Sequence, residues 1–75
     1  MTADQSRMAR TLLRWSLTDL ARAAGIGRAT AARFELGEAV GDGPIAAMRI
    51  ALEAGGAGLI EKGQFVGGVY PAQKP

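Results

Sequence analysis

The chain contains no cysteine and no histidine among its 75 residues. Disulfide bonds, thiol chemistry, imidazole catalysis and a Cys/His zinc site are therefore excluded. The sequence also lacks an apolar run near the ~20 residues that cross a bilayer, and it shows no signal-peptide pattern. We therefore expect a cytoplasmic, soluble protein that does not interact with membranes.

The sequence also lacks a catalytic constellation. Ser6 and Ser16 are the only serines, and neither has a base nearby in the sequence. The carboxylates are scattered, and the glycines at positions 25 and 27 lack the strand-and-helix context of a phosphate-binding loop. We expect neither an enzyme nor a site for a cofactor, a metal ion or a small-molecule effector.

The chain is short enough to form a single domain of limited stability. A domain of this size buries only about 60% of the surface that its unfolded chain exposes. Because such a core is marginal, a partner subunit would add stability.

Positive charge is concentrated in the first half of the chain. The overall net charge is only +2. Residues 1–37 contain six arginines and three acidic residues, whereas residues 38–75 contain three basic and four acidic residues. Every basic residue of the first half is arginine, the side chain best matched to phosphate groups and guanine edges. This distribution favours nucleic acid as a partner of the N-terminal half.

Residues 16–37 read as two short helices joined by a tight turn. Ser16 is a good N-cap. Apolar residues follow at helical spacing, namely Leu17, Leu20, Ala21 and Ala24. Gly25 then ends the first helix, since glycine adopts the left-handed conformation without strain. The second helix begins near Gly27 and ends before Gly37, so the stretch has the form of a helix-turn-helix.

This stretch resembles the lambda-repressor-like DNA-binding domains, the XRE or Cro/repressor family. The residues that carry the resemblance are Ser16, Leu20, Ala21, Gly25, Ile26, Thr30, Phe34, Glu35 and Gly37. The resemblance covers roughly residues 7–52. Leu17 stands where the family usually has a DNA-contacting glutamine, and Gly27 where it usually has a capping Ser or Thr. Ala31 replaces a larger aliphatic core residue, so the resemblance implies modest affinity and a less stable core.

Residues 28–36 form the expected recognition helix. Ala31 and Phe34 point together toward the first two helices, at about 100° per residue. Small and arginine side chains occupy the outer face, which we predict to contact bases: Arg28, Ala29, Ala32 and Arg33, with Leu36 beside them. The resemblance implies backbone contacts by Arg14, Ser16, Leu17, Gly27 and Thr30. The alternative is an alanine-rich helix with unrelated arginines.

A first helix is expected within residues 1–14. Thr2 and Gln5 have the spacing of a capping box. Met8, Leu12 and Trp15 form a helical stripe that we expect to face the core. In the resembling family, an arginine at the position of Arg10 pairs with the glutamate at the position of Glu35, which would tie the first helix to the third. The alternative is that both are plain surface charges.

A fourth helix is expected from about Pro44 to Ala54, because proline is tolerated in the first turn of a helix. Ile45, Met48 and Leu52 form its inward stripe, and Ile50 lies on the opposite side. The glycines of residues 55–58 end this helix.

The residues after 56 read as two short strands around Gly63, or as one strand and a flexible tail. We expect the strands within residues 59–62 and 64–70, with residues 71–75 frayed. An isolated hairpin is marginal in water, and the helices offer no sheet edge. We therefore expect this segment to pair with a second subunit. The residues expected to make the dimer are Ile50, Leu59, Ile60, Phe65, Val66, Val69 and Tyr70.

The sequence thus predicts a mainly α fold: a compact four-helix helix-turn-helix domain in residues 1–56, followed by a strand or hairpin segment in residues 57–75. The leading hypothesis is a homodimeric transcriptional regulator that binds double-stranded operator DNA. Its two recognition helices would enter successive major grooves about 34 Å apart. The alternative is an antitoxin or an accessory protein-interaction module that binds a protein partner through its C-terminal segment and binds DNA only weakly.

Overall fold

The structure is a computed structural model that describes residues 1–72. It contains four helices and two strands: α1 (Ala3–Leu13), α2 (Leu17–Ala24), α3 (Arg28–Glu35), α4 (Asp42–Gly55), β1 (Ala57–Leu59) and β2 (Val69–Pro71). The strands form one antiparallel sheet in which Gly58 faces Tyr70. The mainly α fold with a C-terminal hairpin is therefore confirmed. No helix within the described residues is long and apolar enough to cross a membrane.

The first three helices begin and end where the sequence predicts. Thr2 caps α1 and forms a capping box with Gln5, and Ser16 forms the same motif with Asp19 at the start of α2. Each motif satisfies two backbone amides that the helix itself leaves unpaired. Gly25 ends α2 with a φ of 69°, which confirms it as the left-handed cap.

Helix α4 is longer than predicted. It begins at Asp42, two residues before Pro44, because a proline in the first turn removes only an amide that has no partner inside the helix. Met48, Ala51 and Leu52 are buried, and Ile45 is half-buried, which confirms the inward stripe.

The core lies between all four helices and extends into the hairpin. Its fully buried members include Leu20, Met48 and Leu52, with Ala9 and Ala31 filling the close approaches of the helices. Ala57 of β1 belongs to the same core with 1% of its surface exposed. The helices and the hairpin are thus packed around one interior.

The expectation that Met8 and Leu12 face this core is wrong, because each keeps 39% of its surface exposed. Helix α1 instead buries Gln5, Ser6 and Ala9. Gln5 and Ser6 are polar, and hydrogen bonds to distant parts of the chain allow their burial. Trp15 is half-buried, with its indole against the backbone of α4 at Gly55.

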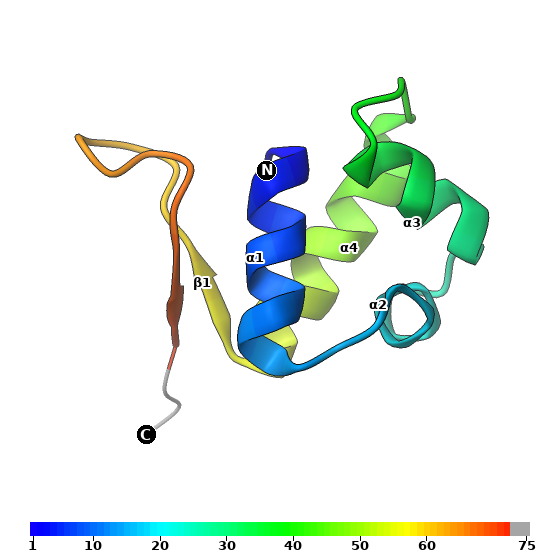
Figure 1. The fold of residues 1–75 in the computed structure, drawn as a ribbon, viewed down its shortest axis with the longest axis horizontal. Coiled ribbons are helices and arrows are strands. Elements are labelled where there is room, and N and C mark those ends of the chain that lie inside the picture. The colour runs from blue at the N-terminus through cyan, green and yellow to red at the C-terminus, as the bar shows by residue number, and fades with distance from the viewer. Residues whose placement is uncertain (73–75) are drawn as a thin grey trace.

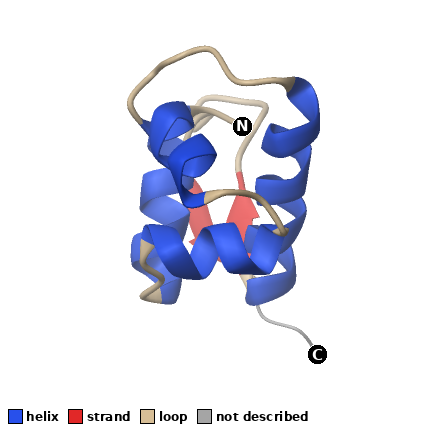
Figure 2. Cartoon of the chain, turned by 90° about the vertical axis from the view of Figure 1, so that its right-hand side faces the viewer, coloured by secondary structure: helices blue, strands red, loops and turns tan. Residues whose placement is uncertain are grey.

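The hairpin packs beside α1 and α4, on the side of the molecule opposite α2 and α3 (Figure 1; Figure 2). The helices of the same chain therefore support the hairpin, which the sequence analysis did not expect, and pairing with a second subunit stays a prediction. Its strands are also shorter than predicted and lie farther apart in the sequence. β1 starts at Ala57, two residues earlier than expected, and residues 60–68 form the connecting loop. The glycines of residues 55–58 allow β1 to begin this early, because α4 ends at Gly55 and only Gly56 separates the helix from the strand.

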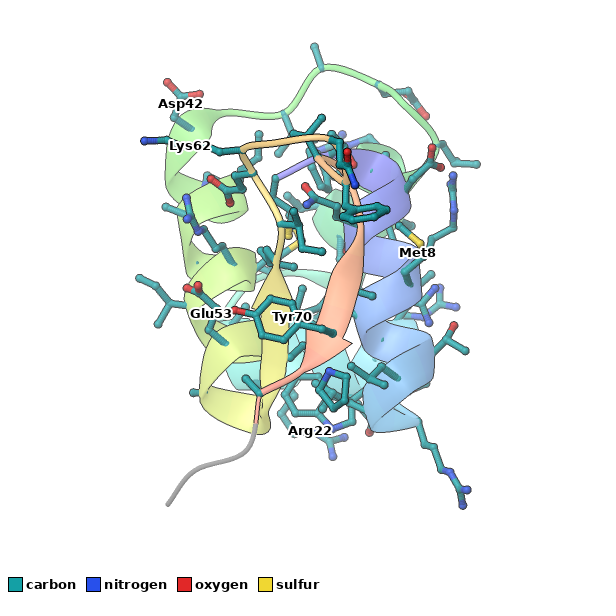
Figure 3. All side chains as sticks on the ribbon, turned by 90° about the vertical axis from the view of Figure 1, so that its left-hand side faces the viewer. Met8, Arg22, Asp42, Glu53, Lys62 and Tyr70 are labelled. Carbon is teal, nitrogen blue, oxygen red and sulfur yellow. The ribbon has the colours of Figure 1, made fainter. Side chains whose placement is uncertain are left out.

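Tyr70 lies across its partner Gly58 on the outer face of the hairpin (Figure 3). A Cβ atom at Gly58 would fall 2.2 Å from the Tyr70 ring, so only glycine admits the ring at this position. An aromatic ring over a cross-strand glycine covers backbone that the glycine leaves bare. The close pairing explains why such a short hairpin is ordered.

The strand β2 continues to Pro71, and the Ala72 amide donates to the Gly56 carbonyl at 2.7 Å. The expectation of a frayed segment is therefore wrong for Pro71 and Ala72. Residues 73–75, which the same expectation included, lie outside the described residues.

Candidate nucleic-acid interface

Helices α2 and α3 are joined by a three-residue turn and stand at one end of the longest axis of the molecule (Figure 1). Figure 2 shows this end facing the viewer, with α1 and α4 behind the pair and the strands behind those. Leu20 and Ala21 of α2 and Phe34 of α3 bury their side chains between the helices. The outer surfaces of α2 and α3 are left free to meet a partner.

The arginines divide into two groups. Arg7, Arg10 and Arg49 form ion pairs with Asp4, with Glu35 and with both Glu53 and Glu61, respectively. Four others make no ion pair within the described part of the chain: Arg14, Arg22, Arg28 and Arg33. All four are exposed, and all lie on α2, on α3 or at the C-terminal end of α1. The helix-turn-helix side therefore carries four exposed arginines outside any ion pair, of which Arg22 still interacts electrostatically with Asp19 of the same helix.

The outer face of α3 matches its prediction. Arg28, Ala29 and Arg33 are exposed, and Ala32 is half-buried. Leu36, just after the helix, keeps 75% of its surface exposed. The face has two cations, small side chains and no acidic residue between them, a composition that fits a major groove.

The residues expected to contact the DNA backbone lie around this face, and two of them carry specific local structure. Arg14 caps α1 in the left-handed conformation, with a φ of 60°, and is the one described residue other than glycine with a positive φ. Ser16 is exposed, but its hydroxyl already accepts the Asp19 amide at 3.0 Å.

The remaining three expected backbone contacts differ in accessibility. Gly27 is exposed and caps α3 without a side-chain hydrogen bond. Thr30 is half-buried. Leu17 is also half-buried, because it packs against the core, which leaves only part of its side chain for a partner.

The predicted pair of Arg10 and Glu35 forms. The Arg10 guanidinium makes two parallel contacts to the carboxylate, Nη2 to Oε1 at 2.7 Å and Nε to Oε2 at 2.8 Å. Glu35 is 5% exposed, and Ser6 Oγ donates to its Oε2 at 2.7 Å. Arg7 donates to the Glu35 carbonyl oxygen. The C-terminal end of α3 is thus fixed to α1 through side chain and backbone.

Two pKa values in this region are shifted. The Glu35 hydrogen bond raises the pKa of Arg10 above its ordinary value, so this cation stays charged at any accessible pH. Hydrogen bonds from the Ser16 backbone and hydroxyl lower the pKa of Asp19. Asp19 therefore carries a negative charge at the start of α2 at neutral pH, where it is favoured by the helix dipole.

The sequence patterns missed two buried polar residues that organise the site. Ser6 supports Glu35 directly. Gln5 Nε2 donates to the carbonyls of Ile60 at 3.0 Å and Gly68 at 3.2 Å, and so holds both arms of the hairpin. The capping box identified Gln5 as a helix-start residue, but its second role depends on partners more than 50 positions away.

The residues expected to make the dimer fall into two sets. Leu59 and Val69 pack against the core of their own chain, and Ile60 is half-buried. The others present apolar surface to solvent: Ile50 (65% exposed), Phe65 (67%), Val66 (62%) and Tyr70 (49%). The first set therefore helps to build the hairpin. The second exposes apolar surface to a partner, and within it Tyr70 also covers Gly58 of its own hairpin.

Within residues 1–72, no group of three acidic residues is placed to hold a metal ion. Two shallow hollows, of about 560 and 420 Å³, lie along α1 beside the hairpin rather than over α3. In the comparison with known proteins, no family model matches the chain, and no curated protein is similar to it at a significant level.

Proposed function

We propose that the chain is a sequence-specific DNA-binding regulator of transcription that acts as a homodimer on operator DNA. The observation that carries the proposal is the presence of three exposed arginines without an acidic partner on the helix-turn-helix side, Arg14, Arg28 and Arg33, while Arg7, Arg10 and Arg49 are paired. A solvated surface usually mixes both signs of charge, whereas a phosphate-binding surface gains from unpaired cations. The resemblance to lambda-repressor-like domains supports the same function, and the proposal places the regulator in the cytoplasm.

In the proposed complex, Arg28 and Arg33 reach base edges, where a guanidinium can pair with guanine O6 and N7. Ala29 and Ala32 allow the helix to approach closely and can contact thymine methyl groups. Arg14, the exposed C-cap of α1, contacts phosphates in this proposal. The buried pair of Arg10 and Glu35 holds α3 in the orientation that this contact needs.

The test is a fluorescence-anisotropy titration against mixed-sequence duplex DNA at several salt concentrations. If a dimer touches on the order of six phosphates, log K should fall with log salt at about −0.9 per contact, or about −5 in all. A slope near zero would show that the arginine surface does not bind the DNA backbone.

The alternative function is a protein-interaction module, such as an antitoxin or accessory factor. Phe65 and Val66 favour it, because more than half of each apolar side chain is exposed on the hairpin loop. The same titration separates the two functions. A protein-interaction module would bind DNA weakly and would show no preference when the sequence of the duplex is varied.

A further inference from the structure

An apolar groove runs along the outer face of α1, between this helix and the hairpin. The larger hollow is lined by Met8, Val66 and Gly67 and by the polar residues Thr2, Asp4 and Arg7. The smaller is lined by Met8, Leu12 and Val69 with Arg7 and Thr11. The two hollows share Arg7 and Met8 and so form one continuous surface. Met8 and Leu12 expose 39% of their surfaces there.

Next to this groove, the hairpin loop presents two protruding apolar side chains. Phe65 and Val66 keep 67% and 62% of their surfaces exposed, and Val66 also lines the groove. A protruding group and an adjacent hollow on one face make that face self-complementary. A two-fold axis between them places each loop over the other chain's groove.

We propose that a second copy of this chain docks on this face, with Phe65 and Val66 of each protomer seated in the Met8–Leu12 groove of the other. The proposal deepens the homodimer of the proposed function by naming its interface. Its test needs no DNA and can therefore fail or succeed independently of DNA binding.

The second copy docks through side chains and not by extending the sheet. The Ile60 amide donates to Gly68 at 2.9 Å, and the Ala72 amide donates to Gly56 at 2.7 Å. Antiparallel ladders alternate, so the backbone groups of Val69 and Pro71 point away from β1, toward the free edge of β2. Pro71 has no N–H to offer there, which blocks a neighbouring strand.

The area available indicates a weak dimer. The exposed parts of Met8, Leu12, Phe65 and Val66 amount to roughly 400 Å², about half of the ~800 Å² that each partner buries in a standard interface. We therefore expect the dimer to dissociate in the micromolar range or above, and to be completed when two copies bind neighbouring half-sites.

Charge and shape also suit a second copy. The arginines of α2 and α3 lie at the end of the long axis opposite the hairpin, so contact through the hairpin loop does not require these cations to meet (Figure 1). Met8 points sideways past the hairpin in Figure 3, along the shortest dimension of the molecule, which is 19 Å.

The experiment is sedimentation equilibrium of the full chain without DNA, from about 10 μM to 1 mM, the range that matches the expected affinity. The parent chain should associate reversibly. Phe65→Asp should raise the dissociation constant at least about tenfold, since it removes the largest apolar side chain of the proposed interface and replaces it with a charge that must be desolvated. Leu36→Asp is the matched control, because it changes a more exposed apolar residue outside this face and should leave association unchanged.

Single-cysteine cross-linking gives an independent readout, because the chain has no cysteine of its own. In a mixture of two single-cysteine variants, Val66→Cys of one chain should form a disulfide with Leu12→Cys of the other much faster than Ile50→Cys does, because Ile50 lies on α4 outside the groove. A parent chain that stays monomeric throughout the range overturns the proposal. An association that Phe65→Asp leaves intact, or faster cross-linking through position 50, overturns it as well.

Discussion

Gln5 and Ser6 are consecutive residues of α1, and their side chains hold opposite parts of the molecule. Gln5 donates to the carbonyls of Ile60 and Gly68 in the hairpin, and Ser6 donates to the Glu35 carboxylate at the end of α3. Both residues are at most 2% exposed. One turn of α1 therefore fixes the hairpin on one side and the proposed recognition helix on the other.

The buried ion pair gives the first prediction. Arg10→Ala should lower the free energy of unfolding by roughly 3–5 kcal/mol, because it leaves the Glu35 carboxylate buried without its counter-ion. Urea denaturation measures the change. Arg49→Ala is the control, since its pairs with Glu53 and Glu61 are partly exposed and should contribute about 1 kcal/mol or less. Equal effects of the two substitutions would contradict the special role of the Arg10–Glu35 pair.

Gln5→Leu should loosen the hairpin more than the helix. The substitution keeps the side chain near its size but removes the donors to two carbonyls, and we expect a loss of about 2–4 kcal/mol. Hydrogen exchange should accelerate at the Ile60 and Gly67 amides, which bond within the hairpin. Thr2→Ala removes the capping interaction alone and should cost about 1 kcal/mol without that local effect. If hydrogen exchange accelerates equally in all helices, Gln5 does not stabilise the hairpin locally.

Arg14→Gly should weaken DNA binding without lowering the stability of the fold. Arg14 sits at a φ of 60°, a conformation that glycine adopts freely, so the melting temperature should stay the same or rise slightly. DNA affinity should nevertheless fall by a similar factor on every sequence, because a phosphate contact is lost. Thermal melts and anisotropy titrations of the same variant provide both numbers. An affinity equal to the parent's would remove Arg14 from the interface.

Arg33→Ala should act differently from Arg14→Gly. Arg33 is proposed to read a base, so its loss should cost about 1–3 kcal/mol on the preferred sequence and should relax specificity at one position. Binding measured on a panel of single-base variants of the preferred duplex reveals this pattern. If both arginine variants weaken all duplexes equally, Arg33 contacts only the backbone.

Stability should vary little between about pH 5 and 9, since no histidine or cysteine titrates there. Hydrogen bonds in the folded state lower the pKa of Asp19 below its ordinary value of 3.8. Its stabilising contribution is therefore present above pH 3.8 and is lost as the pH falls through the folded-state pKa. In thermal melts recorded from pH 5 down to pH 2, Asp19→Asn should make the melting temperature fall less steeply with pH than in the parent chain. If the two chains show the same pH dependence, other carboxylates cause the loss of stability in acid.

The sequence by itself determined the helices, because their signals are local. The capping box of Thr2 and Gln5, the Ser16 cap and the Gly25 stop each involve residues within one turn of one another, and all are present. Helical spacing also identified the inward faces of α2, α3 and α4. The Arg10–Glu35 pair came from the family resemblance rather than from spacing, and the structure contains it.

Only the tertiary structure decided what covers α1. Periodicity assigned Met8 and Leu12 to the core, but α1 turns the face of Gln5 and Ser6 inward instead. Burial of a polar side chain depends on finding hydrogen-bond partners, and those of Gln5 and Ser6 lie 29 to 63 positions away. The hairpin likewise depends on Ala57 entering a core built by distant helices. No local pattern records such contacts, since they exist only once the chain has folded back on itself.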